Sequence, residues 1–482
     1  MSDSGPSSMS DSGSSVETVD ILVIGAGPAG IAAAASTASA GLKTLLVDEN
    51  PSPGGQIYRA ITRSPFRDAA VLGPDYWDGR RLVEDFEASG ATFLGETQVW
   101  SLDATRHVGM SHKGQSRFVR AERIILATGA QERPFPIPGW TLPGVMSVGA
   151  AQTLLKSSGM VPDKRVVIAG QGPLIWLFAA QILRAGGKIE AILDTTPRSS
   201  YLAALPLLPQ FVGSRYALKG ARLMREVARQ TRIVRFVNAL RAEGEDRVSG
   251  LSYRVGRTER RIEADLLLLH QGVVPHVNLA MAAGIAHRWN EQQACFAPVL
   301  DPFGQSGVEG IAIAGDGAGI GGAEAAAERG RLAAWAAIKA MRPGVEDKVP
   351  PVEEIMKALA RAEKGRAFLD RLFLPPKAFR VPPDDETLVC RCEEVTAGAL
   401  RQAVKTGATG PNQLKAYLRC GMGPCQGRLC GLTVTETIAA ERGASPDDVG
   451  YYRLRMPVKP LTLGELAAIE PDPRAISAVV RE

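Results

Sequence analysis

Residues 18–50, TVDILVIGAGPAGIAAAASTASAGLKTLLVDEN, constrain the fold more than any other stretch of the chain. The apolar run ILVI predicts a buried parallel strand, and the alanine-rich segment after it predicts a helix. Between them Gly25, Gly27 and Gly30 form the pattern G-x-G-x-x-G. The first glycine permits a tight turn, the second lets a pyrophosphate approach the backbone, and the third lets the helix lie close to the sheet. The stretch therefore predicts a βαβ dinucleotide-binding unit in an α/β fold.

The second strand of this unit, KTLLV, ends at Asp48, 18 residues after Gly30. An acidic residue at this place accepts hydrogen bonds from an adenosine ribose, and Glu49 is the alternative residue for the role. The amino-terminal end of the helix presents free N–H groups and a positive dipole end to the phosphates. NAD and FAD share this fingerprint, so other residues must indicate which of them binds.

Three later segments indicate a flavin. They are PSPGGQIYR at 51–59, RIILATGA at 123–130 and GIAIAGDGAG at 310–319. With these motifs in this order, residues 18–340 resemble the flavoproteins with two dinucleotide-binding domains, of the glutathione reductase and thioredoxin reductase type.

This resemblance implies FAD as the cofactor, with Gly55 and Gln56 beside it. It also implies that the strand ending in Gly129 closes the FAD domain, and that the Gly315–Asp316 pair places a carboxylate on the ribityl chain. The residues after Asp316 predict a helix whose amino-terminal end faces the flavin pyrimidine ring, where its dipole stabilises the anionic reduced flavin.

Residues 164–194, KRVVIAGQGPLIWLFAAQILRAGGKIEAILD, predict a second βαβ unit. Gly170 and Gly172 are present, but the third glycine position carries Ile175. A branched side chain there pushes the helix and strand apart, or shifts the turn, relative to a working nicotinamide site. Three interpretations stay open: a degenerate domain kept for its fold, a site for another nucleotide, or an NAD(P) site in which Asp194 favours NAD.

Five of the six cysteines lie in the last hundred residues: Cys390, Cys392, Cys420, Cys425 and Cys430. Four thiolates can hold a [2Fe-2S] cluster or a structural zinc ion. The C-x-C pair, followed by 32 residues before Cys425, resembles bacterioferritin-associated ferredoxin and related small helical domains. That resemblance implies Cys390, Cys392, Cys425 and Cys430 as cluster ligands. Because the last spacing is four residues instead of two, Cys420 stays open as a replacement for either late ligand, and zinc and incidental thiols stay open as alternatives.

The remaining cysteine and the histidines limit which reactions the chain can be expected to catalyse. No C-x-x-C or C-x-x-x-x-C pair precedes residue 390, which argues against disulfide reduction, and the solitary Cys295 is expected to be a packing residue. The histidines stand outside any recognisable acid–base motif: His107, His112, His270, His276 and His287. The catalytic residues are therefore unknown from the sequence.

The flavoprotein pattern followed by C-x-C and GMGPCQGRLC, residues 421–430, resembles the large (alpha or A) subunits of bacterial hetero-oligomeric amine dehydrogenases over nearly the whole chain. That group includes opine oxidases, hydrogen cyanide synthase, dye-linked proline and hydroxyproline dehydrogenases and, more distantly, the sarcosine oxidase alpha subunit. The closing RLRMPVKPLTLGELAAI, 453–469, carries the same resemblance. It implies oxidation of a C–N bond in an amino or imino acid such as an opine or a proline derivative. It also implies a second flavoprotein subunit that holds the amine, and leaves open a further flavin at a subunit interface.

A chain of 482 residues has room for about three domains. We expect a disordered tail at 1–17, an FAD-binding domain in the two segments 18–155 and 296–345, and a second, NAD(P)-like domain at 156–295. We expect a linker at 346–386, a [2Fe-2S] domain at 387–446 and a C-terminal tail at 447–482. The basic, proline-containing YYRLRMPVKP in the tail suits either a strap across a neighbouring domain or a solvated end.

Charge and hydropathy exclude some partners. The net charge of +5 is spread along the chain, which argues against a nucleic-acid partner, and no apolar run approaches the ~20 residues of a membrane span. The polar amino terminus has no secretory pattern, so a cytoplasmic location is expected, with a small-molecule electron acceptor or an electron carrier as a further partner. An NAD(P)H-dependent flavin reductase that feeds the cluster, and a non-enzymatic cluster scaffold, are the alternative functions.

Overall fold

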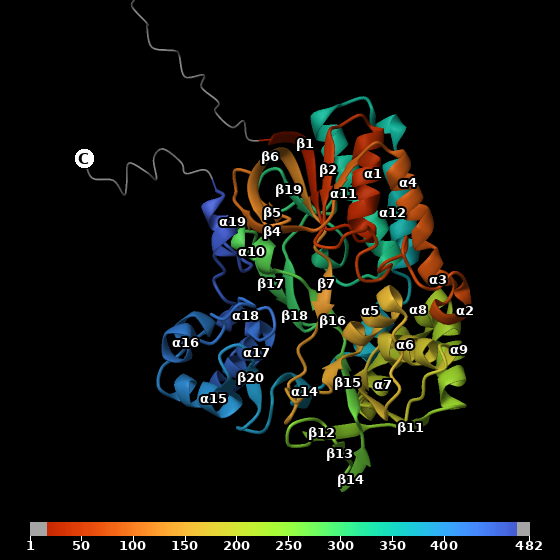
Figure 1. Ribbon diagram of the computed structural model, residues 1–482, viewed down its shortest axis with the longest axis vertical. Coiled ribbons are helices and arrows are strands. Elements are labelled where there is room, and N and C mark those ends of the chain that lie inside the picture. The colour runs from red at the N-terminus through yellow and green to blue at the C-terminus, as the bar shows by residue number, and fades with distance from the viewer. Residues whose placement is uncertain (1–16, 470–482) are drawn as a thin grey trace, which may run out of the picture.

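The structure is a computed structural model that describes residues 17–469. Figure 1 shows the first dinucleotide domain at the top, the second at the lower right and the cysteine-bearing domain at the lower left. The expected N-terminal tail, except residue 17, and the last residues of the expected C-terminal tail lie outside the described residues.

The first domain is built on a seven-stranded sheet in the order β3-β2-β1-β6-β5-β4, with β19 pairing to β6. The strands β1, β2 and β3 are parallel, as are β1, β6 and β19, whereas β4, β5 and the first half of β6 form an antiparallel meander. The bounds are β1 (Glu17–Ile24), β2 (Thr44–Val47), β3 (Thr92–Leu94), β4 (Thr97–Leu102), β5 (His107–His112), β6 (Gln115–Leu126) and β19 (Ile311–Ile313).

Small residues let the helices of this domain pack closely on one face of the sheet. A Cβ atom added to Gly330 of α11 would lie 2.1 Å from the carbonyl oxygen of Ala29 in α1, so only a glycine fits at this contact. The helices are α1 (Pro28–Ser39), α2 (Ala69–Leu72), α3 (Pro74–Trp77), α4 (Gly79–Ala88) and α11 (Ala323–Met341), with the 3₁₀ turn η2 (Gly315–Ala318) before α11. The predicted strand, glycine turn, helix and strand of residues 18–50 are confirmed.

The second domain has a parallel five-stranded sheet in the order β11-β10-β9-β15-β8 and an antiparallel sheet β12-β13-β14 at its end. Its strands are β8 (Val145–Ser147), β9 (Val166–Gln171), β10 (Ala191–Asp194), β11 (Arg232–Val234), β12 (Val237–Glu243), β13 (Gly250–Val255), β14 (Thr258–Glu263) and β15 (Leu266–Gln271). Its helices are α5 (Val148–Ser158), α6 (Pro173–Arg184), α7 (Arg198–Ala204), η1 (Leu205–Leu207), α8 (Leu208–Val212) and α9 (Arg215–Ala228). Two dinucleotide-type domains therefore stand in one chain, as the sequence predicted.

A two-stranded ribbon, β7 (Ala130–Glu132) with β16 (Val273–Pro275), joins the two domains. The chain then returns to the first domain through α10 (Asn278–Ala282) and the hairpin β17 (His287–Asn290) with β18 (Cys295–Pro298).

The segment expected as a linker, residues 346–386, contains helices. They are η3 (Glu346–Lys348), α12 (Val352–Ala362), α13 (Arg366–Leu372) and α14 (Lys377–Arg380). The cysteine-bearing domain follows with β20 (Leu388–Cys390), β21 (Val395–Thr396), α15 (Ala397–Lys405), α16 (Pro411–Leu418), α17 (Gly431–Arg442) and α18 (Pro446–Val449). Its small core includes three of the cysteines.

Residues 450–460, here called the C-terminal strap, run from the cysteine-bearing domain onto the first domain. The Val458 N–H donates to the carbonyl of Trp100 at 2.9 Å, and the Gln98 side chain donates to the carbonyl of Pro460 at 3.0 Å. Val458 is 3% exposed within the core of the first domain. The strap ends before α19 (Leu463–Ala467).

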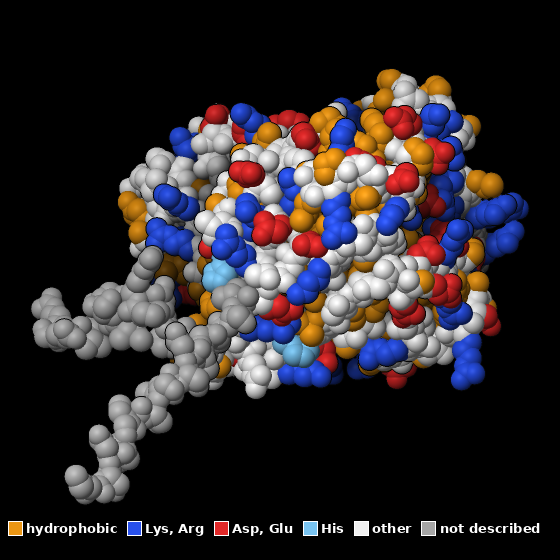
Figure 2. All heavy atoms as spheres, turned by 90° about the horizontal axis from the view of Figure 1, so that it is seen from above, with side chains coloured by type: hydrophobic (Ala, Val, Ile, Leu, Met, Phe, Trp, Pro, Cys, Tyr) orange, Lys and Arg blue, Asp and Glu red, His pale blue; other side chains and the backbone are white. Residues whose placement is uncertain are grey.

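Within residues 17–469, no helix is both long enough and apolar enough to cross a bilayer. Figure 2 shows acidic and basic side chains interspersed over the face seen from above.

Candidate functional site

The glycine turn between β1 and α1 is closed by contacts that only glycines allow. Gly25 has φ +106°, and an added Cβ would lie 2.3 Å from the carbonyl oxygen of Ala127. A Cβ on Gly30 would lie 1.8 Å from the carbonyl oxygen of Gly25. These two glycines are therefore required by the fold itself.

Gly27 differs from its two neighbours, because the fold has room for a side chain there. Its φ is −77°, and the nearest atom to an added Cβ is the Cα of Gly55 at 4.0 Å. The free space lies at the amino-terminal end of α1, where a phosphate group interacts with N–H groups and the helix dipole. Gly54 and Gly55 lie opposite, and the Gly54 N–H donates to the carbonyl of Ala26 at 2.8 Å. The cradle fits a dinucleotide pyrophosphate.

The predicted ribose-binding acid, Asp48, follows β2 and faces the same turn. Its carboxylate accepts hydrogen bonds from the N–H groups of Ala26 at 2.6 Å and Asn50 at 2.7 Å. Glu49 is directed elsewhere and pairs with Lys459 of the C-terminal strap. Burial lowers the pKa of Lys459 to about 8, and the charge of Asp48 opposes that change. Asp48 therefore faces the glycine turn, whereas Glu49 anchors the strap.

The other predicted flavin residues lie at the same edge of the sheet. A Cβ on Gly315 would lie 2.7 Å from the Cβ of Ala29, and one on Gly317 would lie 3.6 Å from the Gly129 backbone. The Asp316 carboxylate accepts hydrogen bonds from Gly321 and Gly322, the two residues before α11. Segments that are far apart in the sequence thus converge around the end of α1.

A buried lysine fixes the loop that carries Gln56. The Lys156 ammonium, on α5, donates to the carbonyls of Gln56 at 3.1 Å and Ile57 at 2.9 Å, and to the side chain of Gln152 at 3.0 Å. Lys156 is 2% exposed, and burial lowers its pKa to about 7, with a further lowering by Arg59. The Gln56 side chain itself accepts a hydrogen bond from Arg59 at 2.9 Å.

This lysine makes stability depend on pH. The unfolded chain keeps the Lys156 proton up to its ordinary pKa near 10.5, whereas the folded protein loses it near 7, so the unfolded state binds more protons between these values. We expect the free energy of unfolding to rise by about 2 kcal/mol from pH 7 to pH 9 through this group. Urea titrations of the wild-type protein and Lys156→Met at both pH values measure it. The variant is expected to lose this increment, and an unchanged increment in the variant would contradict the assignment.

The second glycine turn, between β9 and α6, forms although Ile175 stands at the third glycine position. Ile175 is 1% exposed and lies in the apolar core, and a Cβ on Gly170 would lie 1.7 Å from the carbonyl oxygen of His270. Asp194 is 5% exposed, burial raises its pKa, and its carboxylate accepts from the Thr196 N–H at 2.9 Å. The Gln171 side chain donates to the carbonyl of Phe373 at 2.8 Å, which places the end of α13 against this turn.

The second predicted centre is the cysteine group, Cys390, Cys392, Cys420, Cys425 and Cys430. The sulfur atoms of Cys390, Cys420 and Cys430 lie within 4.8 Å of one another and are buried. The Cys425 thiol is hydrogen-bonded to those of Cys430 and Cys392. The structure therefore brings two of the predicted ligands, Cys390 and Cys430, together with Cys420, and the other two, Cys392 and Cys425, contact each other beside this group.

Contacts among the thiols make two of them acidic. Hydrogen bonds from Cys420 and Cys430 lower the pKa of Cys390 to about 2. A hydrogen bond from Cys430 lowers the pKa of Cys425 to about 5. Metals and iron–sulfur clusters bind the thiolate form, so the donor set fits either a cluster or a metal ion.

The end of the first sheet at Gly129, here called the flavin edge, is hydrogen-bonded through β7 to the backbone of the loop that carries Cys425 and Cys430. The Gln131 side chain, two residues after Gly129, donates to the carbonyl of Arg428 at 2.7 Å. Arg428 lies between Cys425 and Cys430 in the loop of residues 420–430, here called the cysteine loop. The Asn278 side chain donates to the carbonyl of Gln426 in the same loop at 2.9 Å.

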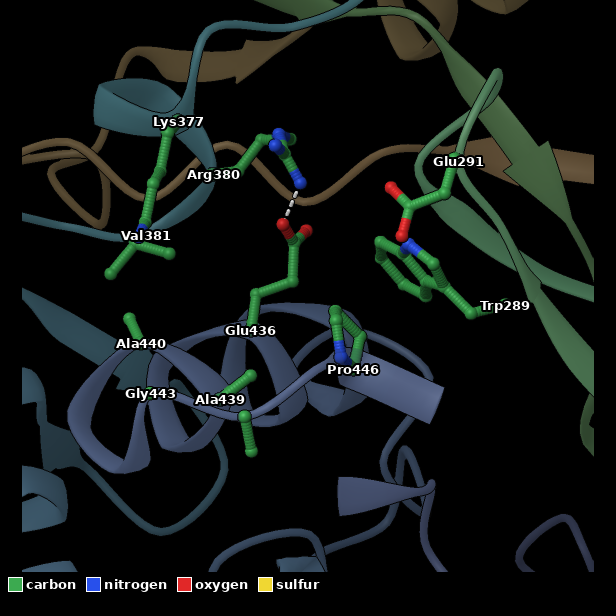
Figure 3. Close-up of a pocket in the computed structure, with 11 residues that line it drawn as sticks. Trp289, Glu291, Lys377, Arg380, Val381, Glu436, Ala439, Ala440, Gly443 and Pro446 are labelled. Carbon is green, nitrogen blue, oxygen red and sulfur yellow. Dashed lines mark hydrogen bonds and ion pairs between the residues drawn. The ribbon is translucent and has the colours of Figure 1, made fainter. Parts of the chain in front are cut away.

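A buried ion cluster holds the cysteine-bearing domain against the other two. Glu436, on α17, pairs with Arg380 of α14 and lies 3.9 Å from a guanidinium nitrogen of Arg133, which follows β7. Figure 3 shows Glu436 rising from α17 toward Arg380, beside a cavity of about 350 Å³ that Trp289 also lines. Arg133 further donates to the carbonyls of Ala294 at 2.9 Å and Gln293 at 2.7 Å. Removing one member would leave a buried charge unpaired.

No sequence motif indicated the roles of several of these residues. Lys156, Glu436 and Tyr452, whose hydroxyl contacts the cysteine group, carry no motif. The one available signal was the glycine spacing in the cysteine loop, because Gly421 and Gly427 leave room for the ring of Tyr452.

The fold and the glycine cradle define a flavoprotein with two dinucleotide-binding domains, joined to a cysteine-bearing domain. The family model for pyridine nucleotide-disulphide oxidoreductases matches residues 19–336, and the model for the sarcosine oxidase A3 domain matches 384–470. The chain belongs to the pyridine nucleotide-disulphide oxidoreductase family, in the group that contains the large subunits of opine oxidases. The resemblance drawn from the sequence is thereby confirmed.

Individual relatives cover nearly the whole chain. The A subunit of opine oxidase from Rhizobium meliloti is 46% identical over 96% of this chain and 90% of its own length. Hydrogen cyanide synthase subunit HcnB of Pseudomonas protegens is 29% identical, over 95% of this chain and 98% of its own. The crystal structure of L-proline dehydrogenase from P. horikoshii superposes with a TM-score of 0.69 at 19% identity, over 94% of this chain and 80% of that one, which confirms the fold.

Proposed function

We propose that the chain is the FAD- and [2Fe-2S]-containing subunit of a hetero-oligomeric oxidoreductase that oxidises the C–N bond of an amino or imino acid, such as an opine or a proline derivative. The names of the relatives, and the opine oxidases above all, support the substrate class and the existence of other subunits. The observation that carries the proposal is the contact between Gln131 and Arg428, which joins the flavin edge to the cysteine loop.

We assign the FAD site to the residues around the end of α1. Gly25 and Gly30 form the turn, Gly27 and Gly55 leave room for the pyrophosphate, and Asp48 accepts from the ribose. The remaining assigned residues are Gln56, Gly129, Gly315 and Asp316, with Glu49 as the alternative to Asp48. Asp316 orders the turn before α11 and thereby directs the end of that helix.

We assign the cluster to Cys390, Cys392, Cys425 and Cys430, with Cys420 as the replacement for either late ligand. Flavin accepts two electrons as a hydride, whereas a [2Fe-2S] cluster carries one electron at a time. A chain with both sites, joined by hydrogen bonds between β7 and the cysteine loop, suits stepwise transfer to a one-electron acceptor. Free clustered thiols also suit the reducing cytoplasm, the compartment that we propose.

The backbone between the two centres is held rigidly. The His276 N–H donates to the carbonyl of Gly129 at 3.0 Å, and the Thr128 hydroxyl donates to the carbonyl of His276 at 3.3 Å. Two further bonds, from Gln131 to Arg428 and from Asn278 to Gln426, reach the cysteine loop. A fixed separation is what repeated electron transfer between two centres requires.

We propose that a second flavoprotein subunit, which holds the amine, docks on the second domain, next to the first domain that carries the proposed FAD site. Apolar side chains are exposed there on α7, η1, α8 and α9: Leu202, Leu205, Leu208, Val212 and Leu218. Such an exposed apolar patch is typical of a protein–protein interface. Arg215, at the start of α9, pairs with Glu324 of α11, so the patch adjoins the helix that follows Asp316.

Co-expression with the neighbouring genes tests this function. We expect the chain to co-purify with a second flavoprotein, and the flavin absorbance of the complex to bleach anaerobically with one member of a panel of opines, proline derivatives and glycine. We expect NADH to leave the absorbance unchanged. Bleaching by the isolated chain would move the amine site to this chain, and bleaching by NADH alone would overturn the proposal in favour of a flavin reductase.

The docking surface has a matched control in the same experiment. Leu202→Glu with Leu205→Glu places charges on the apolar patch and is expected to abolish co-purification, because burying an unpaired carboxylate is costly. Leu463→Glu changes a leucine on α19 that is 85% exposed, more than Leu202 or Leu205, and is expected to retain the partner. Retention of the partner by the double variant would exclude this surface.

A further inference from the structure

Two adjacent tyrosines of the C-terminal strap are inserted into the cysteine loop, and the glycines of that loop make room for them. A Cβ on Gly421 would lie 2.4 Å from the ring of Tyr452, and one on Gly427 would lie 2.6 Å from it. A Cβ on Gly431 would lie 2.1 Å from the hydroxyl oxygen of Tyr451. Three of the four glycines in RCGMGPCQGRLCG therefore match side chains that arrive from 20 to 31 residues further along the chain.

The two tyrosine hydroxyls have different partners. The Tyr452 hydroxyl donates to the Cys420 sulfur at 3.4 Å and lies 3.7 Å from the Cys430 sulfur. The Tyr451 hydroxyl donates to the carbonyl of Gly427 at 3.2 Å. Tyr452 is 2% exposed, so water does not compete for its hydroxyl.

We propose that Tyr452 is a positioning residue that raises the reduction potential of the iron–sulfur cluster by donating a hydrogen bond to its cysteine sulfurs. The inference rests on the cluster of the proposed function. Reduction adds negative charge that is shared by the coordinating sulfurs, and a hydrogen bond to a more negative acceptor is stronger. The hydroxyl therefore stabilises the reduced cluster more than the oxidised one. If Cys420 is a ligand, the hydroxyl donates to it directly at 3.4 Å, and if it is not, the hydroxyl lies 3.7 Å from the sulfur of the ligand Cys430.

The strap supplies this donor from outside the helices that carry the cysteines. Tyr452 also lines a cavity of about 780 Å³ between the strap, α10 and the β17–β18 hairpin, so its ring touches both the thiols and the cavity. The Lys415 ammonium lies 5.0 Å from the centroid of the same ring. Tyr452 lies against the sulfurs near the start of the strap, and Val458 fixes the end of the strap to the first domain. The strap is therefore attached on both sides of the chain segment that separates these two residues.

Tyr452→Phe removes only the hydroxyl and keeps the ring that fills the space beside Gly421 and Gly427. The holoprotein, purified anaerobically with its partner subunits, is titrated with dithionite and mediators, and the reduced cluster is followed by electron paramagnetic resonance. At a fixed solution potential we expect the ratio of reduced to oxidised cluster to fall about tenfold, the effect of one hydrogen bond to a charged group. Tyr451→Phe, the same chemical change one residue earlier, is expected to leave the ratio at the wild-type value.

An unchanged potential in Tyr452→Phe, a rise instead of a fall, or an equal shift in both variants would overturn the inference. The failure of the proposed function looks different: the wild-type protein would then contain zinc or no metal and give no reduced-cluster signal, which would remove this inference together with the cluster.

Discussion

Cys430→Ser is expected to remove the iron and acid-labile sulfide of the anaerobically purified protein while its FAD content stays at the wild-type level. Cys430 is 1% exposed, and its sulfur contacts those of Cys390, Cys420 and Cys425. Loss of a group that only hydrogen-bonds to a ligand already costs metal sites roughly 10- to 100-fold in affinity, so loss of a ligand is expected to cost more. The flavin cradle is built from a different domain and does not depend on this sulfur. Metal analysis and the flavin-to-protein ratio measure the two effects separately.

Cys295→Ala is the matched control, because Cys295 is equally buried but lies in a separate apolar cluster with Phe296. Burial raises the pKa of its thiol to about 11, which makes it a poor ligand. We expect wild-type iron and FAD contents in this variant. Iron retained in both Cys430→Ser and Cys425→Ser, or zinc in the wild-type protein, would contradict the cluster assignment.

A further pair of variants identifies the fourth ligand. If the spacing-based set holds, Cys425→Ser loses the cluster and Cys420→Ser keeps it; if Cys420 replaces Cys425, the results are reversed. If Cys420 replaces Cys430 instead, both of these variants lose the cluster and Cys430→Ser keeps it. The structure makes this comparison necessary, since it places Cys420 within 4.8 Å of Cys390 and Cys430.

Gly27→Ala is expected to lower the bound FAD more than about tenfold without unfolding the protein. The fold accepts a side chain there, because φ is −77° and the nearest atom to the new Cβ is 4.0 Å away. The methyl group instead fills the space that the pyrophosphate needs. A tenfold loss corresponds to about 1.4 kcal/mol, which is less than the phosphate contacts at the end of α1 are expected to supply. Absorbance of the released flavin and circular dichroism of the apoprotein test the two parts.

Substitutions of two other glycines are the controls for Gly27→Ala. Gly30→Ala is expected to lose FAD and also stability, because its Cβ would lie 1.8 Å from the Gly25 carbonyl oxygen. Gly220→Ala, in α9, meets no atom within 4 Å and is expected to keep FAD and to gain up to about 1 kcal/mol in stability. Wild-type FAD content in Gly27→Ala would show that the cofactor does not lie against this turn.

The elements that could be predicted are those whose apolar periodicity and residue spacing lie within one short segment of the sequence. Strand β1, the glycine turn, α1, β2 and Asp48 follow one another within residues 17–48, so local periodicity and spacing were sufficient. The helices α15, α16 and α17 around the cysteines agree with the small helical domain that the cysteine spacing implied. The segment 346–386 was harder, since its proline and charge content resembles a linker although it contains α12, α13 and α14.

The sequence by itself determined the class of fold, the family and the residue types of both centres, because glycine spacing and clustered cysteines are short-range patterns with a fixed chemical meaning. Only the tertiary structure decided which groups complete those centres. Cys420 joins the thiols, Tyr452 reaches their sulfurs, and Gln131 connects the cysteine loop to the flavin edge. The contacts of Tyr452 and Gln131 join positions from 22 to 297 residues apart, and a side chain that meets its partner only after the chain has folded back leaves no periodic trace in the sequence.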